Sequence, residues 1–238
     1  MLIYIHSRDY SFATDFRAKL PGLITTKRFK VRQVYIPNTI YNITSANYKI
    51  YITVGVTTTS VTLVPGNYSI DDLVSHIQTK LNAAALATFT VTYSRITAKV
   101  TIAADATFSL LLGTYTDNPA SIIGFEQVNY TGDTTYTGPN VFNISSQFLQ
   151  LKSAILTNGA MSSNFYGNDP SSNITMSIPI SSLFGGLMYL DDSLSQWVTY
   201  PTNKQITSFD LKLTDEYNSA ISLNGRNFTV IIEFDETK

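Results

Sequence analysis

The sequence predicts an all-β fold, an antiparallel β-sandwich arranged as a single jelly roll, with one inserted α-helix and β-hairpin. Apolar residues alternate with polar ones along many short segments, which is the period of a half-buried strand. Only one segment has the spacing of an amphipathic helix, and long polar loops separate the strand segments. A chain of 238 residues can bury a sizeable core, so we expect one domain over residues 1–238.

The clearest strand patterns close the chain, in residues 206–234. Two segments there place large apolar side chains on one face and polar side chains on the other. The apolar sets are Phe209, Leu211 and Leu213, followed by Phe228, Val230, Ile232 and Phe234. The intervening Asn224-Gly225 pair is typical of a tight turn, because both residues tolerate a positive φ. We assign Phe209 and Phe228, together with Trp197, to the core rather than to a contact surface.

The first part of the chain predicts an extended arm, residues 1–11, followed by four strands. The first strand ends at Pro21-Gly22. The second, residues 29–36, changes the parity of its apolar residues near Arg32-Gln33, which predicts a β-bulge. The apolar residues of the other strands are Phe12, Phe16, Ala18 and Leu20 in the first, Tyr48, Ile50, Ile52 and Val54 in the third, and Val61 and Leu63 in the fourth.

A helix and a hairpin form an insertion at about residues 66–125. The helix spans residues 69–82, with Ser69 as the N-cap and Asp72 as its capping-box partner. Its apolar stripe comprises Ile70, Leu73, Val74, Ile77 and Leu81. The hairpin turns around Arg95. Its facing residues are Phe89, Val91 and Tyr93 on one strand and Ala98, Val100 and Ile102 on the other.

The rest of the chain predicts a short second helix, two loops and further strands. Residues 119–125 predict the helix, and residues 126–140 and 157–173, which are polar and rich in turn formers, predict the loops. The strands are marked by Leu149 and Leu151, by Met176, Ile178 and Ile180, and by Trp197 to Tyr200. Pro179 indicates that its strand lies at a sheet edge.

The composition favours a subunit of an assembly. Charged residues make up 14% of the chain, against about 25% in an ordinary globular domain, and there are 15 Tyr. Protein interfaces are depleted in Lys and Glu and enriched in Tyr. β-rich proteins also favour Thr and Tyr because of their strand propensity, so the bias is a tendency rather than a signature.

Basic residues gather in the first segment, although the net charge of the chain is -1. Residues 1–32 hold Arg8, Arg17, Lys19, Lys27, Arg28, Lys30 and Arg32 against Asp9 and Asp15. We favour a solvated strand face, because Arg17 and Lys19 alternate with apolar neighbours. The alternative is an inner surface that faces a polyanion. The near-neutral charge gives no global attraction to nucleic acid, and we expect no sequence-specific nucleic-acid binding.

The chain carries no signature of secretion or of a membrane span. It contains no Cys, which excludes disulfides and thiolate sites and fits a reducing cytosol. The apolar start Leu2-Ile3-Tyr4-Ile5 is too short for a signal peptide, and no apolar run approaches the roughly 20 residues of a span. We therefore expect no N-glycans at the six sequons, which begin at Asn42, Asn67, Asn129, Asn143, Asn173 and Asn227.

We predict no catalytic, cofactor-binding or metal-ligating residues and no enzymatic activity. His6 and His76 have no Glu or His at ligand spacing, and we expect His76 to be an ordinary exposed residue. The pairs Asp191-Asp192 and Asp215-Glu216 lack the alternating acids of a calcium loop. There is no Gly-x-Ser-x-Gly motif. Separated carboxylates could still pair in the fold as a glycosidase dyad, which no motif favours.

Four sequence blocks are distinctive in their composition and in the order in which they occur. They are IYIHSRDY with a strand opening at Phe12; VYIPNTIYNI; the module LVPGNYSIDDLVSHIQTKLN, FTVTYSRITAKVTI and ASIIGFE; and ITSFDLKLTDEYNSAISLNGRNFTVIIEF. In order and texture they resemble the single jelly-roll penton or minor capsid proteins of tailless icosahedral double-stranded DNA viruses. This family occurs beside double jelly-roll hexons in virophages, Polinton-like elements and giant viruses. None of the blocks is a catalytic signature.

The resemblance implies a penton, a homopentamer at the fivefold vertices that contacts the surrounding major capsid proteins and a vertex fibre or host receptor. It implies synthesis in the host cytoplasm, a place at the virion vertex and an inward-facing basic segment. Two alternatives stay open. One is a minor protein that cements hexons; the other is a carbohydrate-binding jelly-roll spike module, which would show exposed aromatics and a calcium site. A β-sandwich hydrolase is the least favoured.

Overall fold

The computed structural model describes residues 1–144, 147–160, 173–191 and 197–236. Backbone contacts divide the chain into two compact units, Met1–Ile40 with Ser146–Lys238 and Tyr41–Ser145. We call the first the terminal unit and the second the inserted unit. Each has its own hydrophobic core. The predicted helix and hairpin insertion falls within the inserted unit, and the prediction that residues 1–238 behave as a single domain stays a prediction.

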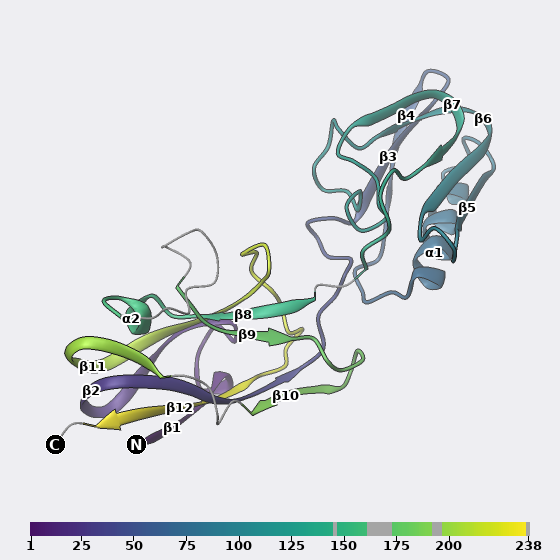
Figure 1. The fold of residues 1–238 in the computed structure, drawn as a ribbon. Helices are drawn as coiled ribbons and strands as arrows, with labels where there is room; N and C mark the ends of the chain where they lie inside the picture. The colour runs from purple at the N-terminus through teal and green to yellow at the C-terminus, as the bar shows by residue number, and fades with distance from the viewer. Residues whose placement is uncertain (145–146, 161–172, 192–196, 237–238) are drawn as a thin grey trace. The chain divides into compact units, whose positions relative to one another are not determined.

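The terminal unit is an antiparallel sheet in which strands distant in sequence lie side by side (Figure 1). Its strands are β1 (Leu2–His6), β2 (Asp15–Pro37), β8 (Phe148–Lys152), β9 (Ile174–Pro179), β10 (Leu187–Asp191), β11 (Val198–Asp215) and β12 (Thr229–Glu236). The order is β1-β12-β2-β11-β8-β9, and β10 also pairs with β2. Two short helices, η1 (Ser7–Asp9) and α2 (Ala154–Thr157), join these strands. The two ends of the chain therefore meet in one sheet.

The long strand β2 organises the core of the terminal unit. Its buried residues change parity between Val31 and Val34, and the β12 register skips Arg32, so the predicted bulge is confirmed. The core alternation of β11 and β12 is also confirmed: all seven predicted apolar residues are buried. Asn224 and Gly225 adopt φ values of 51° and 79°, as the predicted turn requires.

Three predictions for the first segment were wrong. Pro21-Gly22 does not end the strand, since β2 continues through it; only the pairing with β11 is interrupted, between Lys19 and Ile24. Phe12 precedes β2 and is 75% exposed rather than on the core face. The predicted free arm at residues 1–11 contains a paired strand, because β1 lies antiparallel to β12. The long-range partner of a segment is not visible in its own sequence.

The inserted unit combines a five-stranded antiparallel sheet with one helix. Its elements are β3 (Lys49–Val54), β4 (Thr57–Thr62), α1 (Ile70–Ala83), β5 (Phe89–Tyr93), β6 (Val100–Leu111) and β7 (Asn129–Thr137). The order is β4-β3-β6-β5, with β7 also on β6. The Ser69 Oγ accepts a hydrogen bond from the Asp72 N–H at 3.1 Å, so the predicted N-cap is confirmed. The predicted hairpin is confirmed as β5 and β6, except that Ala98 lies in the turn with a φ of 52° and Phe89 pairs with Ala104.

Two predictions for the inserted unit were wrong. Residues 119–125 form successive turns rather than a helix, with the Ile123 N–H donating to the Pro119 carbonyl. Residues 126–140 contain β7 rather than only a loop. Most β7 side chains are exposed, so the strand shows no alternation; Tyr136 is its buried residue and donates its hydroxyl to the Phe108 carbonyl at 2.8 Å.

The antiparallel all-β class with one principal helix is confirmed, and the strand arrangement is consistent with the predicted jelly roll. The predicted loop at residues 157–173 lies mostly outside the described residues. Pro179 ends β9, which pairs only with β8 among the described strands, in agreement with the predicted sheet edge.

Candidate interaction surfaces

The terminal unit presents a tyrosine-rich outer face over four neighbouring strands, β1-β12-β2-β10. One row of directly opposite residues runs His6, Thr229, Tyr35 and Tyr189, and the next runs Tyr4, Ile231, Gln33 and Asp191. Apolar neighbours of these residues along the strands, among them Ile5, Val34, Met188 and Val230, face the core, as the alternation of a strand requires. Leu2 on β1 and Leu187 on β10 belong to the same face, because each is two residues from a tyrosine of its strand. We call these ten residues the tyrosine face.

On β2 and β10, side chains of the tyrosine face contact one another. The rings of Tyr35 and Tyr189 stack with centroids 4.8 Å apart. The Tyr189 hydroxyl and the Gln33 amide both donate to Asp191 Oδ2, each at 2.9 Å. The hydrogen bond to Asp191 is the main cause that raises the pKa of Tyr189 to about 12. The β2 and β10 part of the face is thus an ordered aromatic and polar surface, the kind that loses little side-chain entropy on contact.

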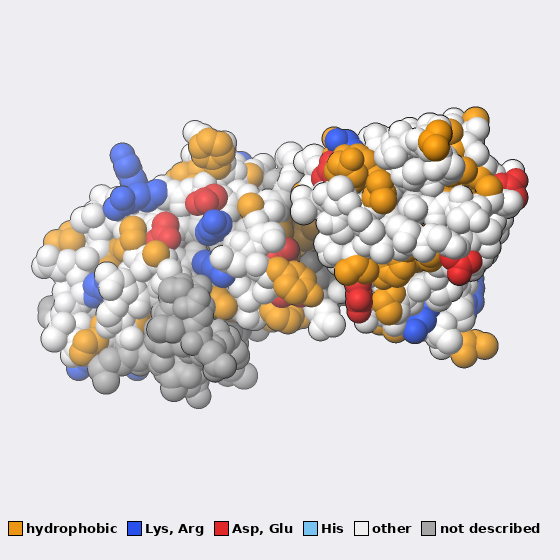
Figure 2. Space-filling model, turned by 90° about the horizontal axis from the view of Figure 1, so that it is seen from above, with side chains coloured by type: hydrophobic (Ala, Val, Ile, Leu, Met, Phe, Trp, Pro, Cys, Tyr) orange, Lys and Arg blue, Asp and Glu red, His pale blue; other side chains and the backbone are white. Residues whose placement is uncertain are grey.

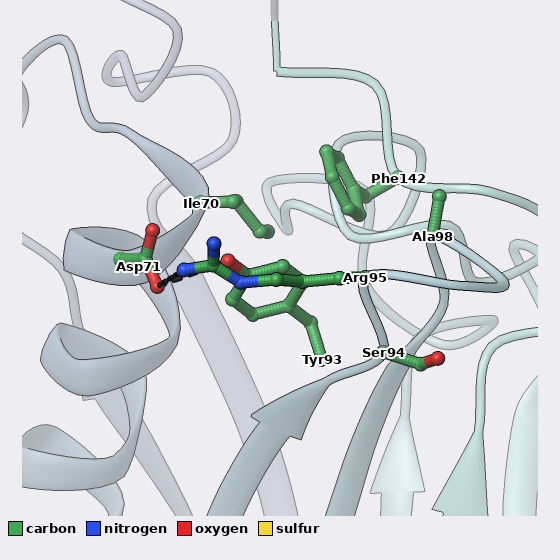
Figure 3. Close-up of a pocket in the computed structure, with 7 residues that line it drawn as sticks. All are labelled: Ile70, Asp71, Tyr93, Ser94, Arg95, Ala98 and Phe142. Carbon is green, nitrogen blue, oxygen red and sulfur yellow. Dashed lines mark hydrogen bonds and ion pairs between the residues drawn. The ribbon is translucent and has the colours of Figure 1, made fainter.

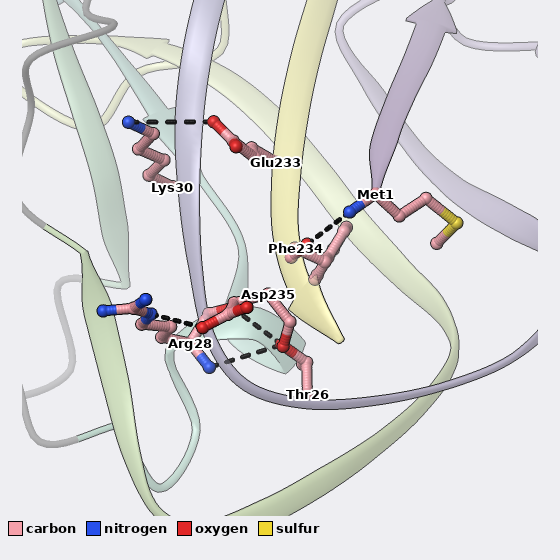
Figure 4. Close-up of polar contacts among 7 residues, drawn as sticks. All are labelled: Met1, Thr26, Arg28, Lys30, Glu233, Phe234 and Asp235. Carbon is pink, nitrogen blue, oxygen red and sulfur yellow. Dashed lines mark hydrogen bonds and ion pairs between the residues drawn. The ribbon is translucent and has the colours of Figure 1, made fainter. Parts of the chain in front are cut away.

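The basic first segment is partly neutralised by acids of β12, as Figure 4 shows. Arg28 Nε lies 2.6 Å from an Asp235 carboxylate oxygen, and Lys30 Nζ lies 3.7 Å from a Glu233 carboxylate oxygen. Arg32 also approaches Glu233, at 3.6 Å. These pairs cross from β2 to β12, so they support the register of the sheet. The basic residues of the first segment that have an acidic partner are therefore more numerous than the sequence alone indicates.

The remaining basic residues of β2 follow the pattern of a solvated strand face. Arg17 and Lys19 are exposed on either side of the buried Ala18. Arg17 donates through Nε to the Ser208 hydroxyl at 2.9 Å. The space-filling view in Figure 2 shows a surface on which charged side chains are sparse among uncharged ones.

Trp197 was wrongly assigned to the core. It is half-buried, and the Arg28 guanidinium carbon lies 4.7 Å and the Lys30 Nζ 5.0 Å from its ring centroid. This is cation–π geometry. Phe209 and Phe228 are fully buried, as predicted.

A shallow hollow of about 290 Å³ lies in the inserted unit, between α1 and the β5–β6 hairpin (Figure 3). Tyr93 donates its hydroxyl to Asp71 Oδ1 at 3.0 Å, and Arg95 lies 3.6 Å from the same oxygen. Phe142 meets the Tyr93 ring edge-to-face at 5.8 Å between centroids. Desolvation, followed by the hydrogen bond to Asp71, raises the pKa of Tyr93. The polar groups of the hollow are therefore already paired with one another.

The predicted acid pairs organise turns. Asp215 Oδ1 accepts hydrogen bonds from the Tyr217 and Ser219 N–H groups at 2.9 and 2.7 Å. Glu216 Oε2 accepts from the Gln147 N–H at 2.9 Å. Asp191 belongs to the tyrosine face, and Asp192 lies outside the described residues. Within the described ranges, no group of three or more His, Cys, Asp or Glu residues is placed to hold a metal ion.

The prediction for His76 was wrong, because this residue is a half-buried structural acceptor. The Val64 N–H donates to its Nε2 at 3.1 Å, and its ring stacks on Tyr68 at 5.2 Å. Burial, followed by the charge of Lys80, lowers the pKa of His76. His6 is in the terminal unit, where its Nδ1 lies 2.9 Å from the Thr229 hydroxyl. The two histidines thus have separate roles in separate units.

The tyrosine face was not found from the sequence, although its signal is present. Each of its three tyrosines stands between two apolar residues, in the triplets Ile3-Tyr4-Ile5, Val34-Tyr35-Ile36 and Met188-Tyr189-Leu190. In a strand the flanking residues face the core and the tyrosine faces outward. The sequence around each triplet does not show that the three triplets lie in one layer of the sheet. Among the helices of the described chain, none is long and apolar enough to cross a membrane.

Comparison with known proteins gives a structural likeness and no sequence match. No family model matches the chain, and no curated protein matches it. The crystal structure of the mavirus penton protein is similar over 100% of both chains, with 10% identity and a TM-score of 0.47. A chain of the cryo-EM structure of the Sputnik virophage is similar over 97% of this chain and 96% of that one, with 14% identity and a TM-score of 0.44.

The first of these structures is of a penton protein, and the second is of a virophage. At these identities and TM-scores the likeness by itself assigns neither family nor function to this chain.

Proposed function

We propose that this protein is a structural component of a viral capsid, a penton protein that forms a homopentamer at the fivefold vertices. The observation that carries the proposal is the tyrosine face, an ordered aromatic surface on a chain with few charges. Tyr-rich, charge-poor surfaces are typical of protein contacts. The order of the four sequence blocks supports the choice of a capsid protein over other assemblies.

In this role the protein binds copies of itself and the surrounding major capsid proteins, and a vertex fibre or host receptor is a further partner. A ring of identical chains closes when one heterologous contact repeats through a fifth of a turn. Synthesis in the host cytoplasm followed by incorporation into the virion vertex fits a chain without Cys. No residue is assigned a catalytic, cofactor or metal role, and the protein is proposed to be a non-enzyme.

Two other functions use the same fold. A minor protein that cements hexons needs no closed ring, so it would stay monomeric alone. A carbohydrate-binding spike module needs an aromatic platform with free polar groups. The hollow of the inserted unit offers Tyr93 and Phe142, but its Asp71 and Arg95 already bond to each other. This pairing disfavours the carbohydrate function.

Light scattering of the purified chain, with negative-stain images of the peak, tests the proposal. We expect a species of five times 26.3 kDa, about 130 kDa, that appears as rings. Mixing with purified major capsid protein is then expected to give vertex-containing assemblies. A chain that remains at 26.3 kDa at every concentration contradicts the pentamer. If that monomer still binds the major capsid protein, the role of a minor protein that cements hexons replaces the penton role.

A further inference from the structure

The four-stranded layer β1-β12-β2-β10 ends in two open edges. Within the described residues, β1 pairs only with β12 and β10 pairs only with β2. Both edge strands are five residues long, LIYIH and LMYLD. An edge strand exposes a row of unpaired backbone groups and is a template for adding a further strand.

These two edges lack the features that protect the edge strands β4, β7 and β9. The outer edge strand β9 ends in Pro179, β4 is TTTSVT, and β7 carries Gly132 with two register shifts against β6. Proline, polar short strands and irregular pairing all discourage strand addition. By contrast, β1 is uncharged from Leu2 to Ile5, and Tyr4 is 62% exposed beside its open edge. On β10, Leu187 and Tyr189 are 58% and 48% exposed.

The hydrogen bonds between each edge strand and its inner neighbour determine which backbone groups of the edge strand point outward. Met1 and Ser7 bond to Phe234 and Phe228 of the β12 segment, so Ile3 and Ile5 also point their backbone groups toward β12. The N–H and C=O groups of Leu2, Tyr4 and His6 therefore point outward. On the other side, the Asn38 N–H donates to the Gly186 carbonyl. By the same alternation, Leu187, Tyr189 and Asp191 direct their backbone groups away from β2.

We propose that β1 of one copy pairs antiparallel with the open edge of β10 in the next copy, which continues the sheet from chain to chain. Within one layer β1 and β10 run in opposite directions, so a rotation about an axis along the strands brings them together antiparallel. Tyr4 then lies opposite Tyr189, Leu2 opposite Asp191 and His6 opposite Leu187. In this register the outward backbone groups of both strands meet, and both tyrosines lie on the same face.

The contact is heterologous, as a closed ring requires. It thus rests on the proposed homopentamer and names the surface that makes it. Two five-residue strands alone bury less than the roughly 800 Å² per partner of a stable interface. The loop before β10 extends the surface, because Leu183 is 89% and Phe184 50% exposed. These apolar side chains continue the contact beyond the paired strands.

Proline substitutions at the open edges test this pairing. Tyr4→Pro and Tyr189→Pro each remove an outward N–H and leave the inner ladder intact. Ser60→Pro is the matched control on the edge strand β4: the bond from the Leu63 N–H to the Tyr48 carbonyl places Val61 toward β3 and Ser60 outward. We expect both edge variants to fall from about 130 kDa to 26.3 kDa while circular dichroism shows that they stay folded, and we expect the control to stay assembled.

Mixing the two edge variants tests the direction of the contact. Each retains one intact edge, so an equal mixture is expected to form a two-chain species of twice 26.3 kDa. If Tyr189→Pro dimerises by itself, β1 pairs with β1 and the inference is overturned. If the wild type forms rings and the edge variants form rings as well, the inference is overturned and the capsid proposal is unaffected. A wild-type chain that stays monomeric overturns both.

Charge variants keep the test decisive if a proline variant fails to fold. A chain with both Tyr4→Glu and Tyr189→Glu places like charges opposite each other across the contact and is expected to be monomeric. A chain with Tyr4→Lys and Tyr189→Glu places opposite charges there and is expected to regain about 130 kDa. Equal masses for these two chains contradict the predicted register. Assembly only when major capsid protein is added would assign the edges to that partner instead.

Discussion

The two units reach the same antiparallel all-β architecture by different routes. The inserted unit is one continuous segment in which β3 and β4, and β5 and β6, are sequential pairs and α1 leads directly to β5. The terminal unit joins both ends of the chain, with β1 on β12 and β2 between β12 and β11. Closing such distant pairs costs more loop entropy. The comparison teaches that the terminal unit depends on long-range pairing and the inserted unit on local pairing.

The largest expected effect is the loss of a core aromatic in one unit at a time. Phe29 is fully buried and lies against Tyr200 and Phe234 of the terminal unit; Phe108 lies against Phe89 and Tyr136 of the inserted unit. We expect Phe29→Ala and Phe108→Ala each to cost about 3–5 kcal/mol of unfolding free energy. Because the two cores share no residue, calorimetry should show two transitions, each lowered by its own variant.

The exposed Phe12→Ala serves as the control for both and should move neither transition. A single transition that both core variants lower equally would break the comparison. It would favour the single domain predicted from the sequence.

Thr214→Val is expected to stabilise the terminal unit alone. Thr214 is fully buried in β11, and its hydroxyl has no hydrogen-bond partner in the described structure. Valine has nearly the same shape and removes a buried polar group that costs about 1–3 kcal/mol when unsatisfied. We expect the terminal transition to rise and the inserted one to stay in place. Thr26→Val is the contrasting variant, since the Thr26 hydroxyl donates to the Asp235 carbonyl, and it should lower the terminal transition.

Ser69→Ala is expected to destabilise the inserted unit alone, by about 1 kcal/mol. The change removes the N-cap acceptor of the Asp72 N–H at the start of α1. Ser75→Ala on the exposed face of the same helix is the control and should have little effect. Denaturant unfolding followed by helix circular dichroism measures both. A loss in the terminal transition would show that the units are coupled.

The difference between local and long-range pairing also explains which features could be predicted from the sequence. The helix, its cap, the hairpin and the bulge at Arg32 depend on neighbours within a few residues, and all were predicted. The strand β7 was missed because an exposed edge strand has no buried face to show. The tyrosine face was missed because Tyr4, Tyr35 and Tyr189 meet only through pairings between distant strands. Local patterns predict elements, and their assembly follows from pairings that no local pattern contains.

The smallest expected effect is a pH dependence confined to the inserted unit. His76 accepts the Val64 N–H in its neutral form, and burial lowers its folded pKa below the ordinary 6.5. The unfolded state therefore binds the proton more readily, so the stabilisation is complete above the unfolded pKa and is lost as the pH falls toward the folded pKa. We expect the inserted transition of the wild type to weaken between about pH 7 and pH 5. His76→Gln should flatten this dependence, whereas His6→Gln in the terminal unit should preserve it; equal slopes in wild type and His76→Gln would remove His76 as its cause.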